Sequence, residues 1–286
     1  MSFGASEDGF SAACGGRIDR KTRVFIQSDP TCTPDRATKD MLYGPANPRL
    51  PNGTINYTVG GLDTVAFTDP NVTYVAASGD WGAKPMWPSD SNKVLSMGGI
   101  NIQGATDVAW DVSGGGVSRH FPTPAHQAAL GFRQRATPDV AMVADSRSAV
   151  SIYVRPQYVM PDSFCAAAKG AANCGWYGGY GTSAAAPMWA GLAAITRAMR
   201  AERNLPVVDF SASIYALATT LQYHQAFADV TAGIGAKLGF DLTTGLGVPK
   251  AAALTKSLSA YSWRGVLAPT DNCPLPGSGL DQRQHC

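Results

Sequence analysis

The chain has 286 residues, of which 45% are hydrophobic and 15% are charged. This composition is typical of one large globular domain or two small ones, and it argues against intrinsic disorder. The net charge is only +2 and the Lys and Arg residues are scattered, so the sequence shows no basic stripe for nucleic acid. The longest apolar run, residues 184–195, is too short to cross a bilayer.

Four short apolar runs rich in β-branched residues predict strands. They are residues 72–77, 93–99, 139–144 and 149–154. The first run ends directly at Ser78-Gly79-Asp80. We therefore expect a buried strand that leads into a functional loop.

Three further segments predict helices. They are residues 187–203, 211–218 and 249–261. Pro187 suits the first turn of the first helix, and Arg and Glu residues follow near its end. Its expected inner face consists of Met188, Leu192, Ile195 and Met199. Strands that alternate with helices indicate an α/β fold with a mainly parallel sheet covered by helices on both faces.

Two regions differ from this pattern. Residues 11–70 are rich in Pro, Gly, Asn and Thr with little periodicity, and we interpret them as a long disulfide-pinned insertion. Residues 268–286 are rich in Pro and Gly and predict a C-terminal surface extension. The predicted catalytic domain therefore covers residues 1–267.

The six cysteines include no C-x-x-C pair, which makes a zinc site unlikely on spacing grounds. Their even number suggests disulfides and an oxidising compartment, so we expect a secreted protein, with reduced thiols as the alternative. Of the roughly 15 possible connectivities, pairing of neighbours is the simplest: Cys14–Cys32, Cys165–Cys174 and Cys273–Cys286. The first eight residues do not form a signal peptide. This conflict predicts that a segment precedes Met1 in the full-length protein.

Several short motifs follow one another in a characteristic order along the chain. They are S-G-D-W-G (78–82), G-G-G-V-S (114–118), P-D-V-A (138–141), G-T-S-A-A-A-P (181–187), and finally D-V-T (229–231) with G-F-D and T-G-L-G (239–247). In this order they resemble the sedolisins, the serine-carboxyl peptidases of family S53, whose fold is similar to that of subtilisin. The resemblance runs from residue 1 to about residue 261, and it implies a subtilisin-like α/β fold that is incomplete at its N-terminus.

Ser183 is the expected nucleophile. A helix that begins beside it directs backbone N–H groups and the positive end of the helix dipole at the site. Both favour the negative charge that arises when a hydroxyl attacks a carbonyl. The structural alternative for an isolated G-T-S is an ordinary helix cap.

Asp80 is the expected oxyanion donor. The subtilisin loop has Asn at this position, whereas the sedolisin pattern has Asp. An aspartic acid donates a hydrogen bond only while it is protonated, so its environment or the working pH must keep the proton in place. Without the other motifs, an Asp in this loop would be a turn residue.

The sequence contains no obvious general base. The sedolisins use a Glu with an Asp nearby, spaced E-x-x-x-D on one helix, which places both carboxylates on one face. In the family this helix precedes the segment that matches residues 2–7, so the Glu/Asp pair is missing from this chain. We therefore expect the chain by itself to have little peptidase activity.

A histidine base is the rival interpretation. The order Asp80, His126, Ser183 is that of subtilisins, but His126 lies in P-A-H-Q rather than H-G-T. The sedolisin pattern has an aromatic residue there, so we interpret His126 as a packing or hydrogen-bonding residue. A second alternative is a non-catalytic pseudoprotease that retains a peptide-binding groove.

The resemblance also implies one structural Ca²⁺ ion, because calcium prefers carboxylate and carbonyl oxygens. The ligands would be the carboxylates of Asp229 and Asp241 and the carbonyls of Val230, Lys237 and Gly239. The alternative is that both Asp residues cap turns. As partners we expect a protein or peptide substrate, no nucleic acid and no membrane, and we expect a monomer.

Overall fold

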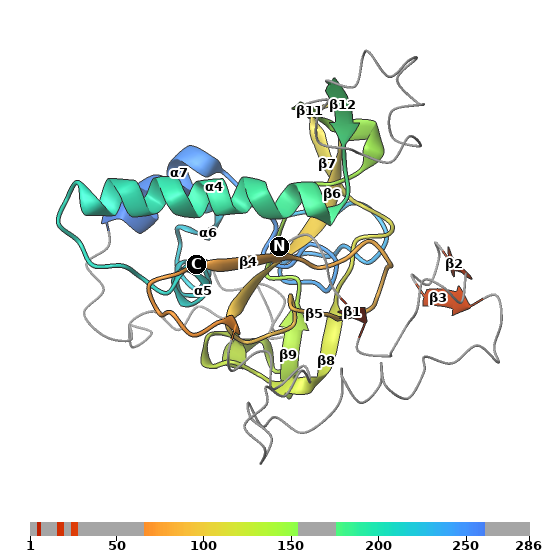
Figure 1. Cartoon of the computed structure of the whole chain (residues 1–286), viewed down its shortest axis with the longest axis horizontal. Coiled ribbons are helices and arrows are strands. Elements are labelled where there is room, and N and C mark those ends of the chain that lie inside the picture. The colour runs from red at the N-terminus through yellow and green to blue at the C-terminus, as the bar shows by residue number, and fades with distance from the viewer. Residues whose placement is uncertain (1–4, 7–15, 20–23, 28–65, 154–175, 261–286) are drawn as a thin grey trace.

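The computed structural model describes residues 5–6, 16–19, 24–27, 66–153 and 176–260, which are drawn as ribbons in Figure 1. All six cysteines lie outside these residues, as do most of the predicted insertion and the predicted C-terminal extension. The predicted disulfides and the domain boundary at residue 267 therefore stay predictions.

The centre of the fold is a four-stranded sheet. It contains β4 (Tyr74–Ala77), β6 (Val94–Gln103) and β10 (Val140–Val143) in the order β10-β6-β4, and β7 (Thr106–Ala109) pairs with the far half of β6. β4 and β10 both run parallel to β6, with Ala77 and Val140 opposite Met97, whereas β7 is antiparallel. The mixed α/β class and the first three predicted strands are confirmed.

The two faces of the sheet carry different clusters, because successive side chains along a strand point to opposite faces. Leu95 and Met97 of β6 belong to the main apolar core. Val94 belongs instead to a smaller cluster with Phe67 and Ala76, and Ile100 belongs to a third. The buried side chains of the helices described below join the main core.

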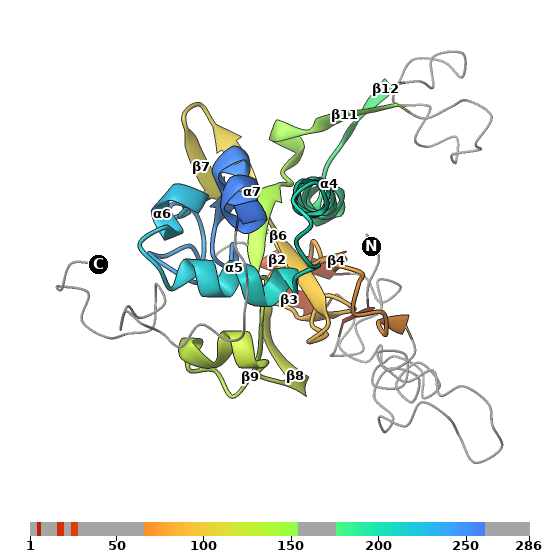
Figure 2. The ribbon, with the colours of Figure 1, turned by 90° about the vertical axis from the view of Figure 1, so that its left-hand side faces the viewer.

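The longest helix, α4 (Thr182–Ala201), packs on β4, β6 and β10 and is seen end-on beside the sheet in Figure 2. The prediction that it begins at Pro187 was wrong, because α4 begins five residues earlier and Pro187 lies in its interior. Proline is tolerated there because the only intrahelical bond it removes is the one to the carbonyl of Ser183, within the first turns.

The predicted inner face of α4 was partly wrong: Leu192 is buried as predicted, Met188 and Met199 are half-buried, and Ile195 is exposed. Trp189, Leu192 and Ala193 are buried in the main core, whereas Ile195 is 54% exposed. The indole of Trp189 fills the centre of the contact and donates a hydrogen bond to the carbonyl of Ala141 at 3.0 Å. This large side chain and the small alanines beside it, rather than the longest aliphatic residues, decide which face turns inward.

Within residues 66–153 and 176–260, the other α-helices given bounds are α5 (Phe210–Ala218), α6 (Tyr223–Ala226) and α7 (Ala251–Ala260). The predictions of helices at 211–218 and 249–261 are confirmed. Asp209 caps α5 by accepting a hydrogen bond from the amide of Ala212, as expected for an Asp that precedes a helix.

Five two-stranded antiparallel sheets surround this body. They are β1 (Ala5–Ser6) with β5 (Met86–Trp87), β2 (Gly16–Asp19) with β3 (Val24–Gln27), β8 (Gly116–Pro122) with β9 (Gln134–Thr137), β11 (Val150–Tyr153) with β12 (Trp176–Gly179), and β13 (Phe227–Ala228) with β14 (Val248–Pro249). Short 3-10 turns occupy Ala125–Leu130 and Ser146–Ser148.

The fourth predicted strand exists as β11, but it pairs with β12 and not with the main sheet. The hairpins β8–β9 and β11–β12 extend from opposite sides of the body (Figures 1 and 2). Within the part of the chain that the structure describes, no helix is both long enough and apolar enough to span a membrane.

Candidate active site

The predicted nucleophile and oxyanion donor meet at the carboxyl edge of the parallel strands. β4 leads into Ser78-Gly79-Asp80, and β10 leads to Ala144. The backbone amide of Gly181, which precedes α4, donates a hydrogen bond to the carbonyl of Ala144 at 2.6 Å. This edge of an open α/β sheet is where ligands usually bind.

Thr182 joins the two chain segments. The backbone amide and the hydroxyl of Thr182 both donate hydrogen bonds to Oδ1 of Asp80, each at 2.8 Å. The same hydroxyl accepts a hydrogen bond from the amide of Gly79 at 3.0 Å. Residues about a hundred positions apart in the chain are thus held in direct contact, and Asp80 caps α4 where Gly181 has no side chain to do so.

Ser183 is the second residue of α4 and is half-buried. A helix of 20 residues begins at Thr182, so the positive end of the helix dipole lies at Ser183. The residue directly before it in the chain binds Asp80. Ser183, Asp80 and the N-terminus of α4 therefore lie next to one another.

Two motif glycines permit this close approach. Gly181 has a φ of 89°, and a Cβ there would lie 2.5 Å from Oδ2 of Asp80. Gly114 of the G-G-G motif donates its amide hydrogen to the carbonyl of Gly79 at 2.6 Å, and a Cβ there would lie 2.2 Å from the carbonyl oxygen of Ser78. Side chains at either position would push the Asp80 loop away.

Asp139 of the P-D-V-A motif lies in a different environment, fully buried at the start of β10. Arg135 binds both of its oxygens, at 2.7 and 2.6 Å, and the Tyr215 hydroxyl and Ser96 amide add hydrogen bonds of 2.8 and 2.7 Å. Burial alone would raise the pKa of Asp139, but the charge and hydrogen bonds of Arg135 hold this pKa below its ordinary value. Asp139 is therefore a charged structural residue.

His126 belongs to this second environment. Its ring lies 5.0 Å from the ring of Tyr215, and the charges of Asp139, Arg135 and Asp209 act on it. Burial lowers the pKa of His126, which favours the neutral imidazole. Its Nε2 is buried and has no hydrogen-bond partner among the described residues. The neighbours of His126 thus come from the Asp139 cluster.

Asp229 and Asp241 lie in the loop between β13 and β14, where the calcium site is predicted. Asp229 accepts a hydrogen bond from the amide of Gly239 at 2.8 Å, and Asp241 accepts one from the amide of Lys237 at 3.1 Å. Burial raises the pKa of both carboxyl groups. Oδ1 of Asp229 is buried without a hydrogen bond from the described residues.

This loop is tied to the active-site edge by Ser113. The Ser113 hydroxyl donates a hydrogen bond to the carbonyl of Thr243 at 2.9 Å and accepts one from the amide of Gly99 at 2.9 Å. Gly114, which follows it, contacts the Asp80 loop. A chain of contacts therefore runs from the predicted calcium loop to the loop that carries Asp80.

Sequence reasoning missed Thr182, Arg135 and Tyr215. Thr182 lies inside the G-T-S motif, but the motif alone does not indicate that its hydroxyl binds Asp80. Arg135 and Asp139 are opposite charges four residues apart, and Asp139 begins an apolar run, which is a signal of a buried pair that could have been used. Tyr215 gave no signal in the sequence beyond its aromatic character.

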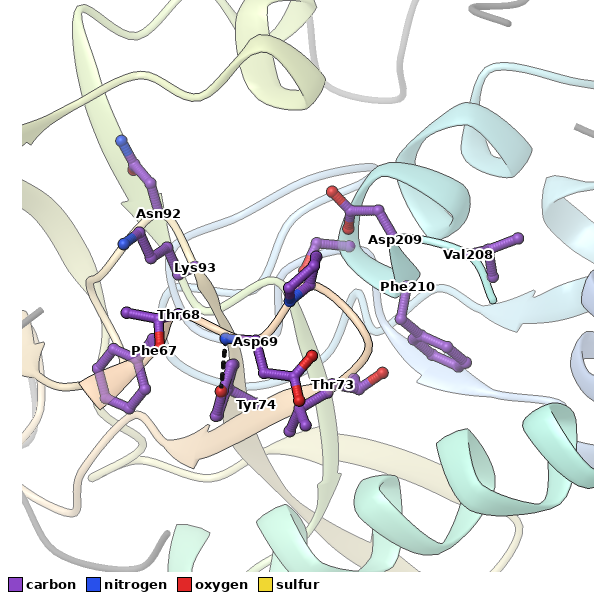
Figure 3. Close-up of a pocket in the computed structure, with 13 residues that line it drawn as sticks. Phe67, Thr68, Asp69, Thr73, Tyr74, Asn92, Lys93, Val208, Asp209 and Phe210 are labelled. Carbon is purple, nitrogen blue, oxygen red and sulfur yellow. Dashed lines mark hydrogen bonds between the residues drawn. The ribbon is translucent and has the colours of Figure 1, made fainter. Parts of the chain in front are cut away.

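A pocket of about 460 Å³ lies at the other edge of the sheet, near the starts of β4, β6 and α5 (Figure 3). Phe67, Asp69, Tyr74, Lys93 and Asp209 are among the residues that line it, and the amide of Asp69 donates a hydrogen bond to the Tyr74 hydroxyl at 3.3 Å. Neither Ser183 nor Asp80 lines this pocket. The motif residues and this pocket thus lie in different places, and we place the active site by the motifs.

Comparison with known proteins finds two curated relatives and a solved structure of similar fold. No protein-family model matches the chain. It is 29% identical to tripeptidyl-peptidase 1 of Dictyostelium discoideum over 221 residues, covering 64% of this chain and 33% of that protein. It is also 29% identical to tripeptidyl-peptidase 1 of Bos taurus over 235 residues, covering 65% of this chain and 37% of that protein. The chain therefore spans about a third of the length of the curated relatives it matches.

The fold is similar to that of a Pseudomonas sedolisin, a serine-carboxyl proteinase whose structure was solved in complex with two molecules of pseudo-iodotyrostatin. The TM-score is 0.52 at 22% sequence identity, over 67% of this chain and 56% of that one. At this identity the match shows the fold alone. The ordered motifs, the curated relatives and the fold together support a sedolisin-type domain: the chain is similar to these proteins in sequence and in fold.

Proposed function

We propose that this domain has the chemistry of a serine-type endopeptidase, with Ser183 as nucleophile and Asp80 as oxyanion donor. One observation carries the proposal: Asp80 is hydrogen-bonded to Thr182, the residue directly before Ser183, at the N-terminus of α4. A nucleophile and a group able to stabilise an oxyanion are the minimum required for acyl transfer.

The reaction would take two steps. The Ser183 oxygen attacks the peptide carbonyl while its proton passes to a general base, and the carbonyl oxygen gains negative charge. Protonated Asp80 and the N–H groups at the start of α4 stabilise this charge. The C–N bond then breaks, the base returns the proton to the leaving amine, and water hydrolyses the acyl-enzyme.

The general base is the part of the mechanism that the described residues do not supply. The resemblance to sedolisins implies a Glu and an Asp that act in acid, where a carboxylate is a useful base. His126 is the rival base, but the interactions that define its environment are with Tyr215, Asp139, Arg135 and Asp209. We therefore retain the carboxylate base and rank His126 below it.

A structural calcium ion is part of the proposal. Among the described residues, no group of three or more His, Cys, Asp or Glu side chains surrounds a possible metal ion, so two carboxylates and several carbonyls would have to serve. The orphaned Oδ1 of Asp229 fits such a role, because a buried carboxylate oxygen without a donor favours a cation. The buried Asp241 and the half-buried Asp229 lie in one loop, and the hydrogen bonds that oppose their raised pKa come mainly from neutral donors.

Asp229, Asp241 and the carbonyls of Val230, Lys237 and Gly239 would hold the ion. When bound, it would neutralise the carboxylates and fix the loop that Ser113 connects to the active-site edge. Asp241 already accepts hydrogen bonds at both oxygens, from Thr243, Thr244 and Lys237, which orients it without metal.

The test of the nucleophile is covalent labelling with a fluorescent fluorophosphonate, both of the chain itself, where labelling should be slow because the base is absent, and of a version that carries an upstream segment containing E-x-x-x-D. We expect one label per chain on Ser183, identified by peptide mass spectrometry, and none in Ser183→Ala. His126→Ala should be labelled as fast as the wild type. Absence of labelling at every pH would favour a non-catalytic pseudoprotease, and loss of labelling in His126→Ala would favour a histidine base.

The test of peptide cleavage compares the chain with a version that carries an upstream segment containing E-x-x-x-D. We expect slow cleavage by the chain itself and a gain of about 10²–10⁴ with the added general base, with an optimum in acid. Robust cleavage at neutral pH by the chain alone would contradict the carboxylate mechanism.

The names of the two curated relatives suggest a second candidate, the release of tripeptides from the N-terminus of a substrate. Matched peptides with a free or an acetylated N-terminus separate the two activities. Equal cleavage of both peptides supports an endopeptidase, whereas cleavage of the free peptide alone supports a tripeptidyl peptidase.

A further inference from the structure

We infer that Thr182 is a positioning residue that determines which oxygen of Asp80 carries the acidic proton. The inference rests on the role proposed above for Asp80 and adds a residue that acts through it. It follows from the direction of three hydrogen bonds around one buried hydroxyl.

The Thr182 hydroxyl has its roles fixed on both sides. Its oxygen accepts a hydrogen bond from the amide of Gly79 at 3.0 Å, and an amide can only donate. Its single hydrogen therefore points to Oδ1 of Asp80, 2.8 Å away. Thr182 is completely buried, so no solvent competes for either bond.

Oδ1 of Asp80 is thereby committed to accept. It receives the hydroxyl hydrogen and the backbone amide hydrogen of Thr182, both at 2.8 Å. A proton on Oδ1 would meet two donors, so the acid proton belongs on Oδ2. Oδ2 lies beside the Cα of Gly181, where a Cβ would approach it to 2.5 Å.

This arrangement matters because only a protonated oxygen can donate to an oxyanion. A carboxylic acid that is free to rotate could present either oxygen with or without its proton. The two hydrogen bonds from Thr182 remove that freedom and leave Oδ2 as the donor. Hydrogen bonds donated to a carboxyl group also favour its charged form, so removal of the Thr182 hydroxyl has an effect that a pH profile can test.

A merely structural role for Thr182 would be to anchor the Gly79-Asp80 loop to α4. That role predicts a lower melting temperature for variants without the hydroxyl. It predicts no change in how the reactivity of Ser183 depends on pH. The pH profile therefore separates positioning from anchoring.

The experiment measures the rate of fluorophosphonate labelling of Ser183 in the full chain between about pH 3 and pH 8. Thr182→Val removes the hydroxyl with little change in volume, and Thr182→Ser keeps it and serves as the matched control. For the Val variant we expect labelling at least about tenfold slower in acid, and an alkaline limb moved up by about one pH unit. The Ser variant should keep the wild-type limb and a rate within about threefold of wild type.

Asp80→Asn shows whether Asp80 causes the fall in labelling rate at the alkaline end of the profile. An amide donates at every pH, so this fall should disappear in that variant. If Asp80→Asn removes the limb but Thr182→Val leaves it in place, the inference about Thr182 is wrong and the proposed role of Asp80 stands. If Thr182→Val and Thr182→Ser change the profile equally, the hydroxyl has no positioning role.

A second measurement does not require a reactive serine. Carboxyl ¹³C NMR of the Asp80 side chain, assigned with Asp80→Asn, follows its titration in wild type, Thr182→Val, Thr182→Ala and Thr182→Ser. We expect the transition to move to higher pH in the Val and Ala variants and to stay in place in the Ser variant. An unmoved transition in Val and Ala overturns the inference, even if the absence of labelling has already overturned the proposed function.

Discussion

Asp80 and Asp139 are two motif aspartates next to strands of the same parallel sheet, and their surroundings differ in kind. Asp80 follows β4, is half-buried, and receives two hydrogen bonds from the neutral Thr182, both on one oxygen. Asp139 precedes β10, is fully buried, and has a guanidinium on both oxygens with three further donors. The surroundings keep Asp139 ionised, whereas both hydrogen bonds that Thr182 donates to Asp80 fall on one oxygen.

The comparison explains why only one of them is a candidate for chemistry. A group that changes protonation during a reaction must not be committed at every lone pair, because each donor favours the charged form. Asp139 is satisfied by Arg135, Gln127, Tyr215 and Ser96, so it stabilises the fold. Asp80 keeps Oδ2 outside the hydrogen bonds from Thr182, beside a glycine that leaves it room.

The largest expected effect comes from breaking the buried pair. Asp139→Asn should lower the free energy of unfolding by about 3–5 kcal/mol, because it leaves the Arg135 guanidinium buried without a counter-charge. Asp80→Asn should change the free energy by no more than about 0.5 kcal/mol, since the amide oxygen still accepts from Thr182. Urea unfolding followed by circular dichroism measures both.

The two variants are matched in chemistry and differ only in surroundings, so each is the control for the other. Equal losses of stability would show that the Asp80 loop is as structural as the Asp139 cluster. If Asp139→Asn does not fold, adding Arg135→Met removes the uncompensated charge while the amide oxygen keeps an acceptor for Ser96 and Tyr215, and should restore part of the lost stability.

The motif residues can be read from the sequence because they are local patterns, and their catalytic roles stay predictions. A strand followed by S-G-D, and G-T-S before an Ala-rich segment, are read from neighbours in the chain, and the structure brings them together. The hydroxyl of Thr182 bonds to residues about a hundred positions away, and no local pattern announces such a partner. The positions of the motifs along the chain were predictable, but which groups donate and accept hydrogen bonds between them was not.

The helix errors have the same origin. Pro187 predicts the start of α4 because proline favours the first turn of a helix. The helix begins at Thr182 instead, where Gly181 and Thr182 are held by hydrogen bonds to other segments of the chain. The inner face was assigned from aliphatic periodicity, whereas Trp189 occupies the core and Ile195 faces outward. Tertiary contacts of one large residue outweigh the periodicity of smaller ones.

The Asp229–Asp241 loop sharpens the comparison with a third kind of carboxylate, buried without a bound guanidinium. With calcium at about 100 times its dissociation constant we expect a gain of about 2.7 kcal/mol, and hence a melting temperature higher by about 5–10 °C. Differential scanning calorimetry with calcium and with EDTA measures the shift, and isothermal titration calorimetry measures binding directly.

Asp229→Asn and Asp241→Asn should each abolish the calcium-dependent shift, whereas Asp69→Asn, at an exposed carboxyl group, should retain it. An identical melting temperature in calcium and EDTA, with no heat of binding, would mean that both aspartates only cap turns.

The smallest expected effect concerns His126, which lies on the structural side of the comparison. Burial lowers the pKa of this imidazole, the charge of Asp139 opposes that shift, Arg135 adds to it, and Asp209 opposes it again. The native state therefore binds fewer protons than the unfolded state below the ordinary histidine pKa of about 6.5. Stability is then present above that pH and is lost as the pH falls toward the lower native value, at no more than about 1.4 kcal/mol per pH unit.

His126→Phe should keep the ring contact with Tyr215 and remove this dependence. The difference in unfolding free energy between His126→Phe and wild type, measured in urea at about pH 7.5 and pH 5, cancels the titration of all other groups. At the lower pH, the unfolding free energy of His126→Phe relative to wild type should be higher by about 1 kcal/mol. Fluorophosphonate labelling of Ser183 should stay unchanged. A pH-independent difference together with lost labelling would move His126 from the Asp139 cluster to the active site, and the contrast between the two aspartates would no longer separate chemistry from structure.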